Sequence, residues 1–316
     1  MPKPSTPRHA GGFIHFEDLD EPAPQRQPAR KSLPEQPAGG MVFISFGSGS
    51  SGNCAYIGTQ EQGVLIDAGI DPDIVLNHLG RNGIAPRAVK AVVLTHDHQD
   101  HVRYVYRLIR TLDRRIAVYC TMRVMKGLLR RHNISSRVKD YKVDIWHETP
   151  FHVAGMEFTA FETSHDGSDN MGFSITLADK TFVVATDMGV ITDRAAFYMA
   201  QADYLMIESN YDSEMLAGGR YPEYLKNRVS GPRGHLDNVV AADFVAHRCG
   251  GNLQWVFLCH LSQDNNTPEI ALKAMRTAIE RTGRTVGSGN NDVDDRDRDI
   301  QVYALPRYDA TPLFVL

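Results

Sequence analysis

Residues 95–101 constrain the fold and the chemistry of this chain more than any other stretch. They read Thr-His-Asp-His-Gln-Asp-His, so three histidines and two aspartates occupy six positions directly after the apolar run 91–94. Such a run predicts a buried strand, which would deliver the whole cluster to the loop at its carboxyl end. Imidazole and carboxylate groups suit zinc, manganese or iron, and one tight turn can supply ligands to two ions. The stretch therefore predicts a metal site.

The composition is that of an ordinary globular protein. The 316 residues are enough for one large α/β domain or two smaller ones, and 42% of them are hydrophobic and 23% charged. No apolar run approaches the roughly 18 residues that span a bilayer, and the N-terminus lacks the apolar core of a signal peptide. The four cysteines are scattered without a CxxC pair, which argues against a thiolate zinc site and a disulfide framework. We expect a cytoplasmic protein that does not contact a membrane.

Residues 1–40 differ from the rest of the chain. They hold 8 of the 16 prolines and many Ala, Gln and charged residues, a composition that predicts a disordered extension. The apolar island 13–16 within it is a candidate contact for the body of the protein or for a protein partner. We expect the folded domain to occupy residues 41–316.

The folded part alternates strand patterns with helical periodicity. In the first half we expect strands at 42–46, 54–58, 64–67, 91–94 and 116–119, and helices at 72–82, 102–112 and 121–132. In the second half we expect strands at 156–163, 173–177, 181–185, 203–207, 253–258, 300–304 and 312–316, and helices at 214–228, 237–248 and 267–281. Two strand-rich halves with interleaved helices predict an α/β fold in which helices cover a sandwich of two sheets.

Further histidines and aspartates fall just after predicted strands, namely Asp67, His165, Asp187 and His260. Each is thereby delivered to a loop at one end of a sheet, where α/β proteins build their sites. Any one of them alone would be interpreted as a turn former or a satisfied polar residue. Together with the cluster at 96–101 they predict one shared site.

The order of these motifs resembles that of the metallo-β-lactamase superfamily, whose fold is a four-layered αββα sandwich. The resemblance implies two divalent ions, Zn²⁺ or Mn²⁺, with a hydroxide shared between them as the nucleophile. One ion would be bound by His96, His98 and His165, the other by Asp100, His101 and His260, and Asp187 would bridge them. Asp67 would orient a histidine ligand through its second ring nitrogen, and Asp67 and Asp100 would belong to the catalytic machinery.

One carboxylate and one further histidine indicate the reaction. Glu208 ends the predicted strand at 203–207, and His235 precedes a predicted helix in the stretch Gly-His-Leu-Asp-Asn at 234–238. A histidine backed by a carboxylate can protonate a leaving alkoxide, which is the difficult step once metals stabilise the phosphate in phosphodiester cleavage. The alternative is that His235 is an ordinary residue at a helix start.

A more detailed resemblance is to the YycJ (WalJ) family. It is carried by Ser-Gly-Ser-Ser-Gly-Asn-Cys at 48–54, Glu-Ser-Asn-Tyr-Asp at 208–212, residues 221–226 and 234–238, and His-Leu-Ser-Gln-Asp-Asn-Asn at 260–266. It implies a 5′→3′ exonuclease that acts on DNA. Glu208, His235 and His260 also look like the matching positions of ribonuclease Z. Tyr211 departs from the family, in which histidine often follows Glu-Ser-Asn, and residues 188–260 are too few for a β-CASP insertion.

The segment between Arg103 and Lys142 holds 12 Lys and Arg against two acidic residues, a surplus that the net charge of −4 conceals. It begins two residues after His101, so we expect it beside the metal site, where it would follow a nucleic-acid backbone. The alternative is a solvated helix face with buried tyrosines. The candidate phosphate contacts are Arg103, Arg107 and Arg110, and the candidates for stacking on bases are Tyr104, Tyr106 and Tyr119.

The glycine-rich loop 47–53 is a second candidate substrate contact, through Ser51 and Asn53. Glycines permit the backbone N–H groups of such a loop to approach a phosphate closely. The loop lacks the spacing of a nucleotide-binding P-loop, and an ordinary mobile turn is the alternative.

The residues thus predict a metal-dependent phosphodiesterase, and the resemblance implies a dinuclear centre and most specifically a 5′→3′ DNA exonuclease with nucleic acid as its partner. Two alternatives use the same centre: a phosphodiesterase for small cyclic or nucleotide esters, which would not need the basic segment, and an RNA-processing nuclease. A non-enzyme alternative is a metal-stabilised regulatory module that works through residues 1–40. The residues leave open zinc against manganese and DNA against RNA.

Overall fold

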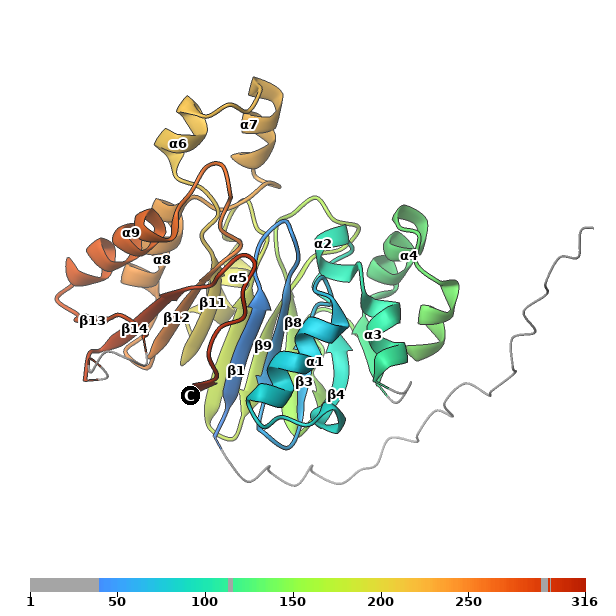
Figure 1. Ribbon diagram of the computed structural model, residues 1–316. Coiled ribbons are helices and arrows are strands. Elements are labelled where there is room, and N and C mark those ends of the chain that lie inside the picture. Colours follow the sequence, from blue (N-terminus) through green and yellow to red (C-terminus); the bar gives the residue numbers. More distant parts are fainter. Residues whose placement is uncertain (1–39, 113–115, 291–294, 296) are drawn as a thin grey trace, which may run out of the picture.

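The structure, a computed structural model, describes residues 40–112, 116–290, 295 and 297–316. Two β-sheets pack face to face, and helices cover the outer face of each (Figure 1). This arrangement confirms the predicted αββα sandwich. Apart from Gly40, the predicted N-terminal extension lies outside the described residues, so the domain boundary at 41 stays a prediction.

The first sheet has the strand order β15-β1-β2-β3-β4-β5-β6. Strands β3 to β6 run parallel to one another, whereas β1, β2 and β3 form an antiparallel meander. Its strands are β1 (Val42–Gly47), β2 (Cys54–Gly58), β3 (Gly63–Ile66), β4 (Val89–Val93), β5 (Ala117–Cys120), β6 (Lys142–Asp144) and β15 (Phe314–Val315).

The second sheet has the order β13-β14-β12-β11-β10-β9-β8-β7. Strands β10, β11, β12 and β14 are parallel, and β7, β8 and β9 extend the sheet as antiparallel strands. Its strands are β7 (Phe151–Val153), β8 (Met156–Glu162), β9 (Met171–Leu177), β10 (Lys180–Ala185), β11 (Tyr204–Glu208), β12 (Trp255–Cys259), β13 (Val286–Gly287) and β14 (Ile300–Ala304).

Alternate residues of the central strands face two different cores. Phe182 of β10 belongs to the core between the sheets, while its neighbour Val183 packs with the outer helices. Between the sheets, the ring centroid of Phe43 lies 5.1 Å from that of Phe182 and 4.6 Å from that of Phe257. Because successive side chains of a strand point to opposite faces, strands covered on both faces are continuous apolar runs in the sequence.

Helices form the outer layers of the sandwich (Figure 1). On the first sheet lie α1 (Pro72–Arg81), α3 (Val105–Thr111) and α4 (Met122–Arg131), and on the second α5 (Asp193–Met199), α8 (Asn238–Arg248) and α9 (Pro268–Glu280). The short helix α2 (Gln99–Val102) follows β4, while α6 (Ser213–Gly218) and α7 (Glu223–Val229) connect β11 to α8. No helix among the described residues is long and apolar enough to cross a membrane.

Some predicted elements differ from those observed. The helix predicted at 214–228 is two helices, because Gly218 and Gly219 end the first and Pro222 begins the second. The helix predicted at 102–112 is likewise divided into α2 and α3. Strands β6 and β7 and helix α5 are too short, at 3 to 7 residues, to show a clear periodicity in the sequence. Residues 188–260, all described, contain no inserted domain between these elements.

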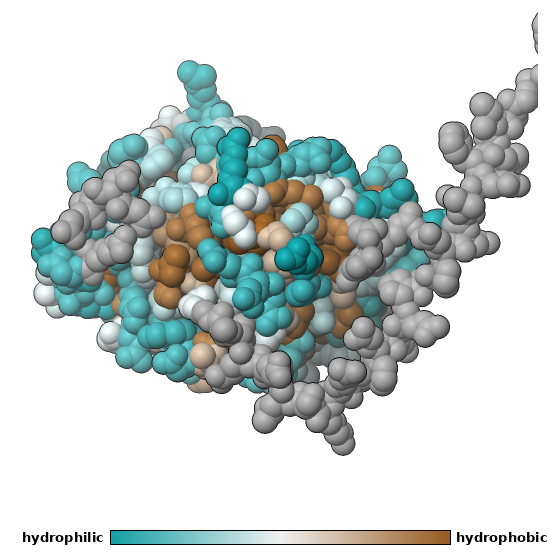
Figure 2. Space-filling model, turned by 60° about the horizontal axis from the view of Figure 1, so that its bottom comes forward, coloured by the Kyte–Doolittle hydropathy of each residue, from teal (hydrophilic) through white to brown (hydrophobic). Residues whose placement is uncertain are grey.

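The carboxyl ends of β3, β4, β10, β11 and β12 lie at the upper end of the sandwich in Figure 1. The predicted site residues follow these strands, so they gather at that end. Figure 2 turns the lower end forward and shows hydrophobic side chains near its middle, bordered by hydrophilic ones. The hydrophobic surface in that view is therefore away from the loops that carry the site.

Candidate metal centre

The histidine-rich run lies at the carboxyl end of β4, where it turns into α2. Asp67, at the end of the neighbouring β3, fixes this turn because its carboxylate accepts hydrogen bonds from the backbone N–H and the hydroxyl of Thr95, both at 2.8 Å. His96 and His101 are buried, and His98 is half-buried. The turn therefore carries its side chains inward, into the space between the sheets and the loops.

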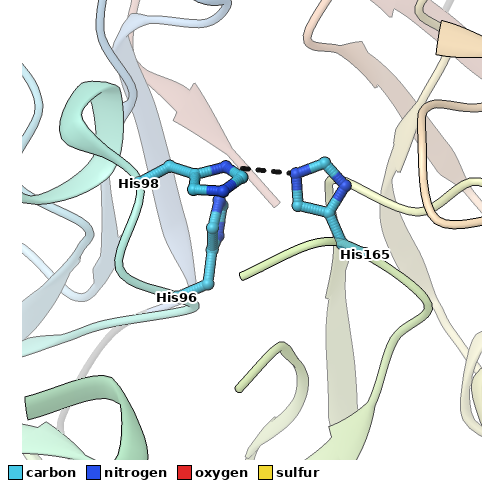
Figure 3. A group of neighbouring side chains, drawn as sticks. All are labelled: His96, His98 and His165. Atoms are coloured by element: carbon cyan, nitrogen blue, oxygen red, sulfur yellow. Dashed lines mark hydrogen bonds between the residues drawn. The ribbon is translucent and has the colours of Figure 1, made fainter. Parts of the chain in front are cut away.

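The first group of candidate ligands consists of His96, His98 and His165, each with a ring nitrogen within 4.8 Å of the others (Figure 3). His165 comes from the loop that follows β8, in the other sheet. Its Nε2 faces Nδ1 of His98 at 3.2 Å. Nδ1 of His165 is 2.8 Å from the carbonyl of Gly234 and can only donate to it. In the neutral imidazole Nε2 therefore carries no proton, and its lone pair is available to a metal ion.

The second group consists of Asp100, His101 and His260, again with ligand atoms within 4.8 Å. Asp187 lies between the groups. One of its carboxylate oxygens is 2.8 Å from Nε2 of His101 and 3.2 Å from Nε2 of His96, and the other is 3.1 Å from Nδ1 of His260. The structure thus brings all the predicted metal ligands together, and their division between two ions stays a prediction.

Residues at three strand ends of this centre have a strained backbone. Asp67, Asp187 and His260 have φ values of 61°, 53° and 54°, in the left-handed region that residues with a Cβ rarely adopt. Each such residue costs about 1 to 3 kcal/mol, which the surrounding contacts must offset. Strained residues of this kind cluster at functional sites, and here they mark the end of the sandwich where the ligands meet.

The hydrogen bonding of the two groups fits divalent cations. Nε2 of His96 is buried without a hydrogen-bond partner among the described residues, although Asp187 is 3.2 Å away. Nδ1 of His101 donates to Asp67 at 2.7 Å, so that its Nε2 is directed at the centre. The carboxylate of Asp67 makes the imidazole of His101 a better ligand for a metal ion. Within the described part of the chain, the buried Nε2 of His96 lacks a hydrogen-bond partner, and a metal ion would take that place.

The charges of the groups fit cations as well. Burial, with the neighbouring His101, lowers the pKa of His96, which keeps its imidazole neutral as a ligand must be. Burial also acts to lower the pKa of His101, but the carboxylates of Asp187, Asp100 and Asp67 outweigh it and raise that pKa well above its usual range. The excess of carboxylate around these rings would be neutralised by divalent ions, so the residues present fit such cations.

His235 and Glu208 form a pair beside these groups. Nδ1 of His235 is 2.7 Å from Oε1 of Glu208, whose other oxygen accepts hydrogen bonds from the backbone N–H groups of Met188 and Leu236. Burial acts to raise the pKa of Glu208, but the charge and hydrogen bond of His235 outweigh it and lower that pKa. The carboxylate is fully buried, whereas the side chain of His235 is 22% exposed. The pair therefore connects a fixed buried charge to a solvent-accessible imidazole.

The position of His235 is central. Its ring centroid lies 5.0 Å from that of His165 in the first ligand group and 5.1 Å from that of His260 in the second. An imidazole between both groups and open to solvent is within reach of a substrate held by either.

The stretches at 208–212, 234–238 and 260–266, which carry the closer family resemblance, meet behind this pair. Asn238 accepts a hydrogen bond from the hydroxyl of Ser209 at 2.6 Å, and its amide donates to Asn266 at 2.9 Å. Asn210 donates to the carbonyl of His260 at 2.6 Å. Tyr211, the departure from the family, is buried against α6 and α7. These side chains act as a scaffold that fixes Glu208, His235 and His260 relative to one another.

Asp97, inside the histidine-rich run, ties the first ligand group to α4. Its carboxylate accepts hydrogen bonds from the N–H and the hydroxyl of Ser168, at 2.8 and 2.7 Å, in the loop of His165. Helix α4 passes so close that a Cβ on Gly127 would lie 1.9 Å from the same carboxylate, which explains a glycine inside this helix. The sequence offered no sign of this role, because Asp97 stands among predicted ligands and Gly127 is 30 residues away.

The predicted substrate-binding residues are placed unequally. Nδ2 of Asn53 is at the centre, 3.0 Å from Nε2 of His101 and 3.2 Å from Oδ2 of Asp100. Ser51 is half-buried in the same loop, and Arg103 is exposed just after α2. Asn53 therefore contacts the second ligand group, whereas substrate binding by Ser51, Asn53 and Arg103 stays a prediction.

The remaining predicted contacts are less available to a substrate. Arg107 is ion-paired with Asp71 at 2.6 Å and with Asp73 at 2.7 Å. Arg110 is near the end of α3, which leads to the start of β5 at the opposite end of the first sheet (Figure 1). Tyr119 stacks on Phe151, and Tyr104 and Tyr106 are half-buried. Tyr106 and Tyr119 therefore pack against the core, whereas stacking of Tyr104 on a base stays a prediction.

Two charged residues near the centre were not identified from the sequence. One oxygen of Asp166 is 3.2 Å from Nε2 of His98, and the other accepts from the guanidinium of Arg228 on α7 at 2.8 Å. Its position next to His165 was the available signal. Arg307 lies near the second group, since it donates to the carbonyl of Leu261, next to His260. It follows β14 in a segment without a recognisable motif, so nothing in the neighbouring sequence indicated its position.

Comparisons with known proteins agree with this geometry. The chain matches the family described as Beta-lactamase superfamily domain over residues 62–251. It is 30% identical over 248 residues to exodeoxyribonuclease YycJ of Bacillus anthracis, covering 78% of this chain and 92% of that protein. It is 29% identical over 275 residues to exodeoxyribonuclease WalJ of Streptococcus pneumoniae, covering 87% of this chain and 97% of that protein. The solved structure of Zn²⁺-bound PqqB from Methylobacterium extorquens has the same fold, with a TM-score of 0.61 and 16% identity over 87% of this chain and 100% of that one.

Proposed function

Because this chain belongs to the metallo-β-lactamase superfamily and, within it, to the hydrolases that resemble YycJ and WalJ, we propose that it is a DNA exonuclease that uses two divalent metal ions. The chain is a metal-dependent hydrolase of the nuclease or phosphodiesterase type. Two ions, DNA as the substrate and digestion in the 5′→3′ direction are the finer parts of the proposal. The direction rests on the resemblance of the stretches at 208–212, 234–238 and 260–266.

The observation that carries the proposal is the position of His235, backed by Glu208 at 2.7 Å and lying between both ligand groups. When a phosphodiester is cleaved, the departing sugar oxygen must gain a proton. A histidine paired with a carboxylate can supply it, and the side chain of His235 is 22% exposed and so accessible from solvent. Glu208 holds the imidazole in one orientation.

Divalent ions held by His96, His98 and His165 and by Asp100, His101 and His260 would polarise the phosphate and make a water molecule nucleophilic near neutral pH. The other residues prepare that site. Asp187 lies between both groups and supplies negative charge, and Asp67 keeps His101 in one orientation. The amide of Asn53 donates to the carbonyl of Gly49 and to Asp100, so it holds the glycine-rich loop against the second ligand group.

The substrate class is supported by the outer surface of α4. This helix touches the ligand loops through Gly127, and its side chains Arg123, Lys126 and Arg130 are exposed. Within the described part of the chain, Lys126 and Arg130 have no ion-pair partner. Unpaired cations on a helix next to a phosphodiesterase centre can follow a nucleic-acid backbone.

Trp146 adds a surface for bases beside that helix. Its side chain is 64% exposed, which is unusual for a tryptophan. The next residue, His147, and the α4 cap residue Thr121 both bond to Asp169, in the same loop as His165. An exposed ring that is connected in this way to the start of a basic helix suits stacking on single-stranded nucleic acid. A phosphodiesterase for small esters would need neither the cations nor the ring, so these features favour the nuclease over that alternative.

The test combines metal analysis with digestion of substrates labelled at either end. We expect about two zinc or manganese ions per chain, and release of nucleotides from 5′-labelled DNA before the 3′ label is affected. RNA of the same sequence should be cleaved more slowly. Cleavage of bis-p-nitrophenyl phosphate without cleavage of any nucleic acid would support the small-ester phosphodiesterase instead. If the metal-loaded protein hydrolyses no phosphodiester, the proposed enzymatic activity is contradicted. That result would support the alternative of a regulatory role through residues 1–40.

A further inference from the structure

A further positively charged side chain, that of Arg307, lies close to the metal centre, on the side away from α4. Arg307 follows β14 and reaches back to the glycine-rich loop, where its guanidinium donates to the hydroxyl of Ser50 at 3.1 Å. It also donates to the carbonyl of Leu261, the residue after the ligand His260. A Cβ on Gly49 would lie 2.9 Å from the same guanidinium, so this glycine makes room for the arginine. Arg307 therefore sits where two loops of the centre meet.

Both of these loops are bonded directly to the second ligand group. Asn53 accepts a hydrogen bond from the N–H of Gly49 at 2.8 Å and reaches His101 at 3.0 Å. The hydroxyl of Ser48 accepts from the backbone N–H of His260 at 2.9 Å. A group bound by Arg307 would therefore be separated from the ligands by only the glycine-rich loop.

The charge of Arg307 is not matched by a carboxylate. Among the described residues, no Asp or Glu forms an ion pair with it, and its hydrogen-bond acceptors are the neutral oxygens of Ser50 and Leu261. The carboxylate of Asp264 is near enough to influence its pKa but accepts instead from the hydroxyl of Tyr221 at 2.9 Å. A half-buried guanidinium has five N–H donors in a fork that matches phosphate, and here some of them stay available.

An exposed aromatic ring stands beside this cation. Tyr308 is 62% exposed, and its hydroxyl is held by Gln263 at 2.9 Å. The guanidinium of Arg307 lies 5.8 Å from the centre of the ring. A fixed, exposed ring next to a cation offers one surface for a base and another for its phosphate.

We propose that Arg307, Ser50 and Tyr308 form a nucleotide subsite beside the second ligand group, in which the guanidinium and hydroxyl bind a phosphate and the tyrosine ring packs on a base. The inference rests on the proposed nuclease function and extends it: the strand passes from α4 across the metal centre to this corner. Ser50, Arg307 and Tyr308 lie outside residues 62–251, so the subsite is not part of the matched superfamily region. The phosphate is either internal to the strand or terminal.

The test measures binding of a fluorescent phosphorothioate DNA strand, which is cleaved slowly, over a range of salt concentrations. Losing one phosphate contact should lower the slope of log affinity against log salt by about 0.7 to 0.9, and affinity in ~0.1 M salt by about five- to eightfold. We expect this for Arg307→Gln, whereas Arg307→Lys should keep most of the slope. Arg110→Gln, at the far end of the sheet, is the matched control and should bind as wild type does.

The ring is tested separately. Tyr308→Ala should weaken binding by about fivefold or more with an unchanged salt slope, because stacking is not ionic. Tyr308→Phe keeps the ring and should bind nearly as wild type. A 5′-phosphorylated strand and its 5′-hydroxyl counterpart distinguish the source of the phosphate: an Arg307 effect on the first alone indicates a terminal phosphate, and an equal effect on both indicates an internal one.

Two results would overturn the subsite. One is an unchanged salt slope in Arg307→Gln. The other is a loss of bound metal and of bis-p-nitrophenyl phosphate hydrolysis in both Arg307→Gln and Arg307→Lys, which would show that the arginine only supports the ligand loops. The subsite predicts instead that hydrolysis of this small ester stays within about twofold of wild type, while KM for DNA rises in line with the loss of affinity. A wild-type protein that neither binds nor cleaves nucleic acid would refute the proposed function itself, and that result appears before any variant is made.

Discussion

The two flanks of the metal centre are built in opposite ways. On the α4 flank, the cations Arg123, Lys126 and Arg130 come from one helix, and the exposed Trp146 follows 16 residues later. On the other flank, Arg307 contacts Ser50, which is 257 positions away in the sequence, and Tyr308 is held by Gln263. The first flank is a dense, exposed patch of charge, and the second is a single half-buried cation in a fixed position.

This difference indicates a division of labour. An exposed patch of mobile cations attracts a polyanion without demanding one position of the strand, because each contact is screened and interchangeable. A half-buried guanidinium fixed by two loops accepts a phosphate in one place only, so it can set the register of the strand against the metals. We therefore expect changes on the α4 flank to affect affinity alone, and changes nearer the ligands to affect metal binding and turnover.

The largest effects should come from removing one ligand on each side. His165→Ala and His260→Ala should each lower bound metal from about two ions to about one, and turnover by more than about 10⁴-fold, because charge on the phosphate is then poorly stabilised. Metal analysis by mass spectrometry and hydrolysis of bis-p-nitrophenyl phosphate measure the two effects. If either variant loses both ions, the two ligand groups do not bind metal independently.

The next effect is expected at the residue between the flanks. His235→Ala should retain both ions and lower turnover by about 10²- to 10⁴-fold, because the leaving oxygen then lacks its proton donor. His247→Ala, an exposed histidine on α8 that pairs with Asp243, is the control and should have wild-type turnover. Normal turnover of His235→Ala with intact metal would remove this residue from the mechanism.

A smaller effect should be confined to the Arg307 side of the centre. Asp67→Asn removes the carboxylate that orients His101 at 2.7 Å and should weaken binding of one ion by about 10- to 100-fold. Titration with a competing chelator would resolve this as one weakened site and one unchanged site. Equal weakening of both sites would show that Asp67 supports the whole centre rather than one ligand.

The α4 flank should respond only in affinity. Lys126→Gln should weaken DNA binding by about five- to eightfold in ~0.1 M salt and lower the salt slope, since one phosphate contact is lost. Arg107→Gln should change binding less than twofold, because this arginine is already paired with Asp71 and Asp73. Hydrolysis of the small ester should be unaffected in both variants, and a loss of it in Lys126→Gln would contradict the division between the flanks.

The smallest effect concerns the pair of His147 and Asp169, which supports Trp146 on the α4 flank. The hydrogen bond to Asp169 raises the pKa of His147. Burial acts to raise the pKa of Asp169, but hydrogen bonds from His147 and Thr121 outweigh burial and lower the pKa of Asp169. A histidine with a raised pKa stabilises the fold fully at a pH below its unfolded pKa of about 6.5. This stabilisation is lost as the pH rises through the pKa of the folded state. An aspartate with a lowered pKa stabilises the fold fully at a pH above its unfolded pKa of about 3.9. This stabilisation is lost as the pH falls through the pKa of the folded state.

The pair should therefore stabilise the fold most between about pH 4 and pH 6.5. His147→Gln should lower the free energy of unfolding by about 0.5 to 1 kcal/mol at ~pH 6 and by less at ~pH 9, the partial exposure of the histidine limiting the effect. Denaturant unfolding at both pH values measures the difference. An equal loss at both would mean that the charge of His147 does not contribute.

The sequence was sufficient wherever the informative residues are neighbours or directly follow strands. The run at 96–101 and the residues after β8, β10 and β12 supplied the candidate ligands that the structure brings together, because these residues come just after strands that are recognisable in the sequence. The division of the helix predicted at 214–228 was missed although its cause, glycines followed by proline, is visible in the chain. The packing of Tyr106 and Tyr119 against the core could not be predicted, since the exposure of a ring depends on what packs against it, as Phe151 does against Tyr119.

By itself, the sequence predicted the fold class and the candidate metal ligands, because these depend on local periodicity and on residue types at strand ends, and its motifs carried the family resemblance. Only the tertiary structure decided which cations face the centre. It placed Arg110 at the far end of the first sheet, paired Arg107 with two aspartates, and brought Arg307 from the last segment of the chain to the glycine-rich loop. Charge can be counted along a chain, but its availability to a ligand depends on distances to other charges, and those distances exist only once the sheets have packed.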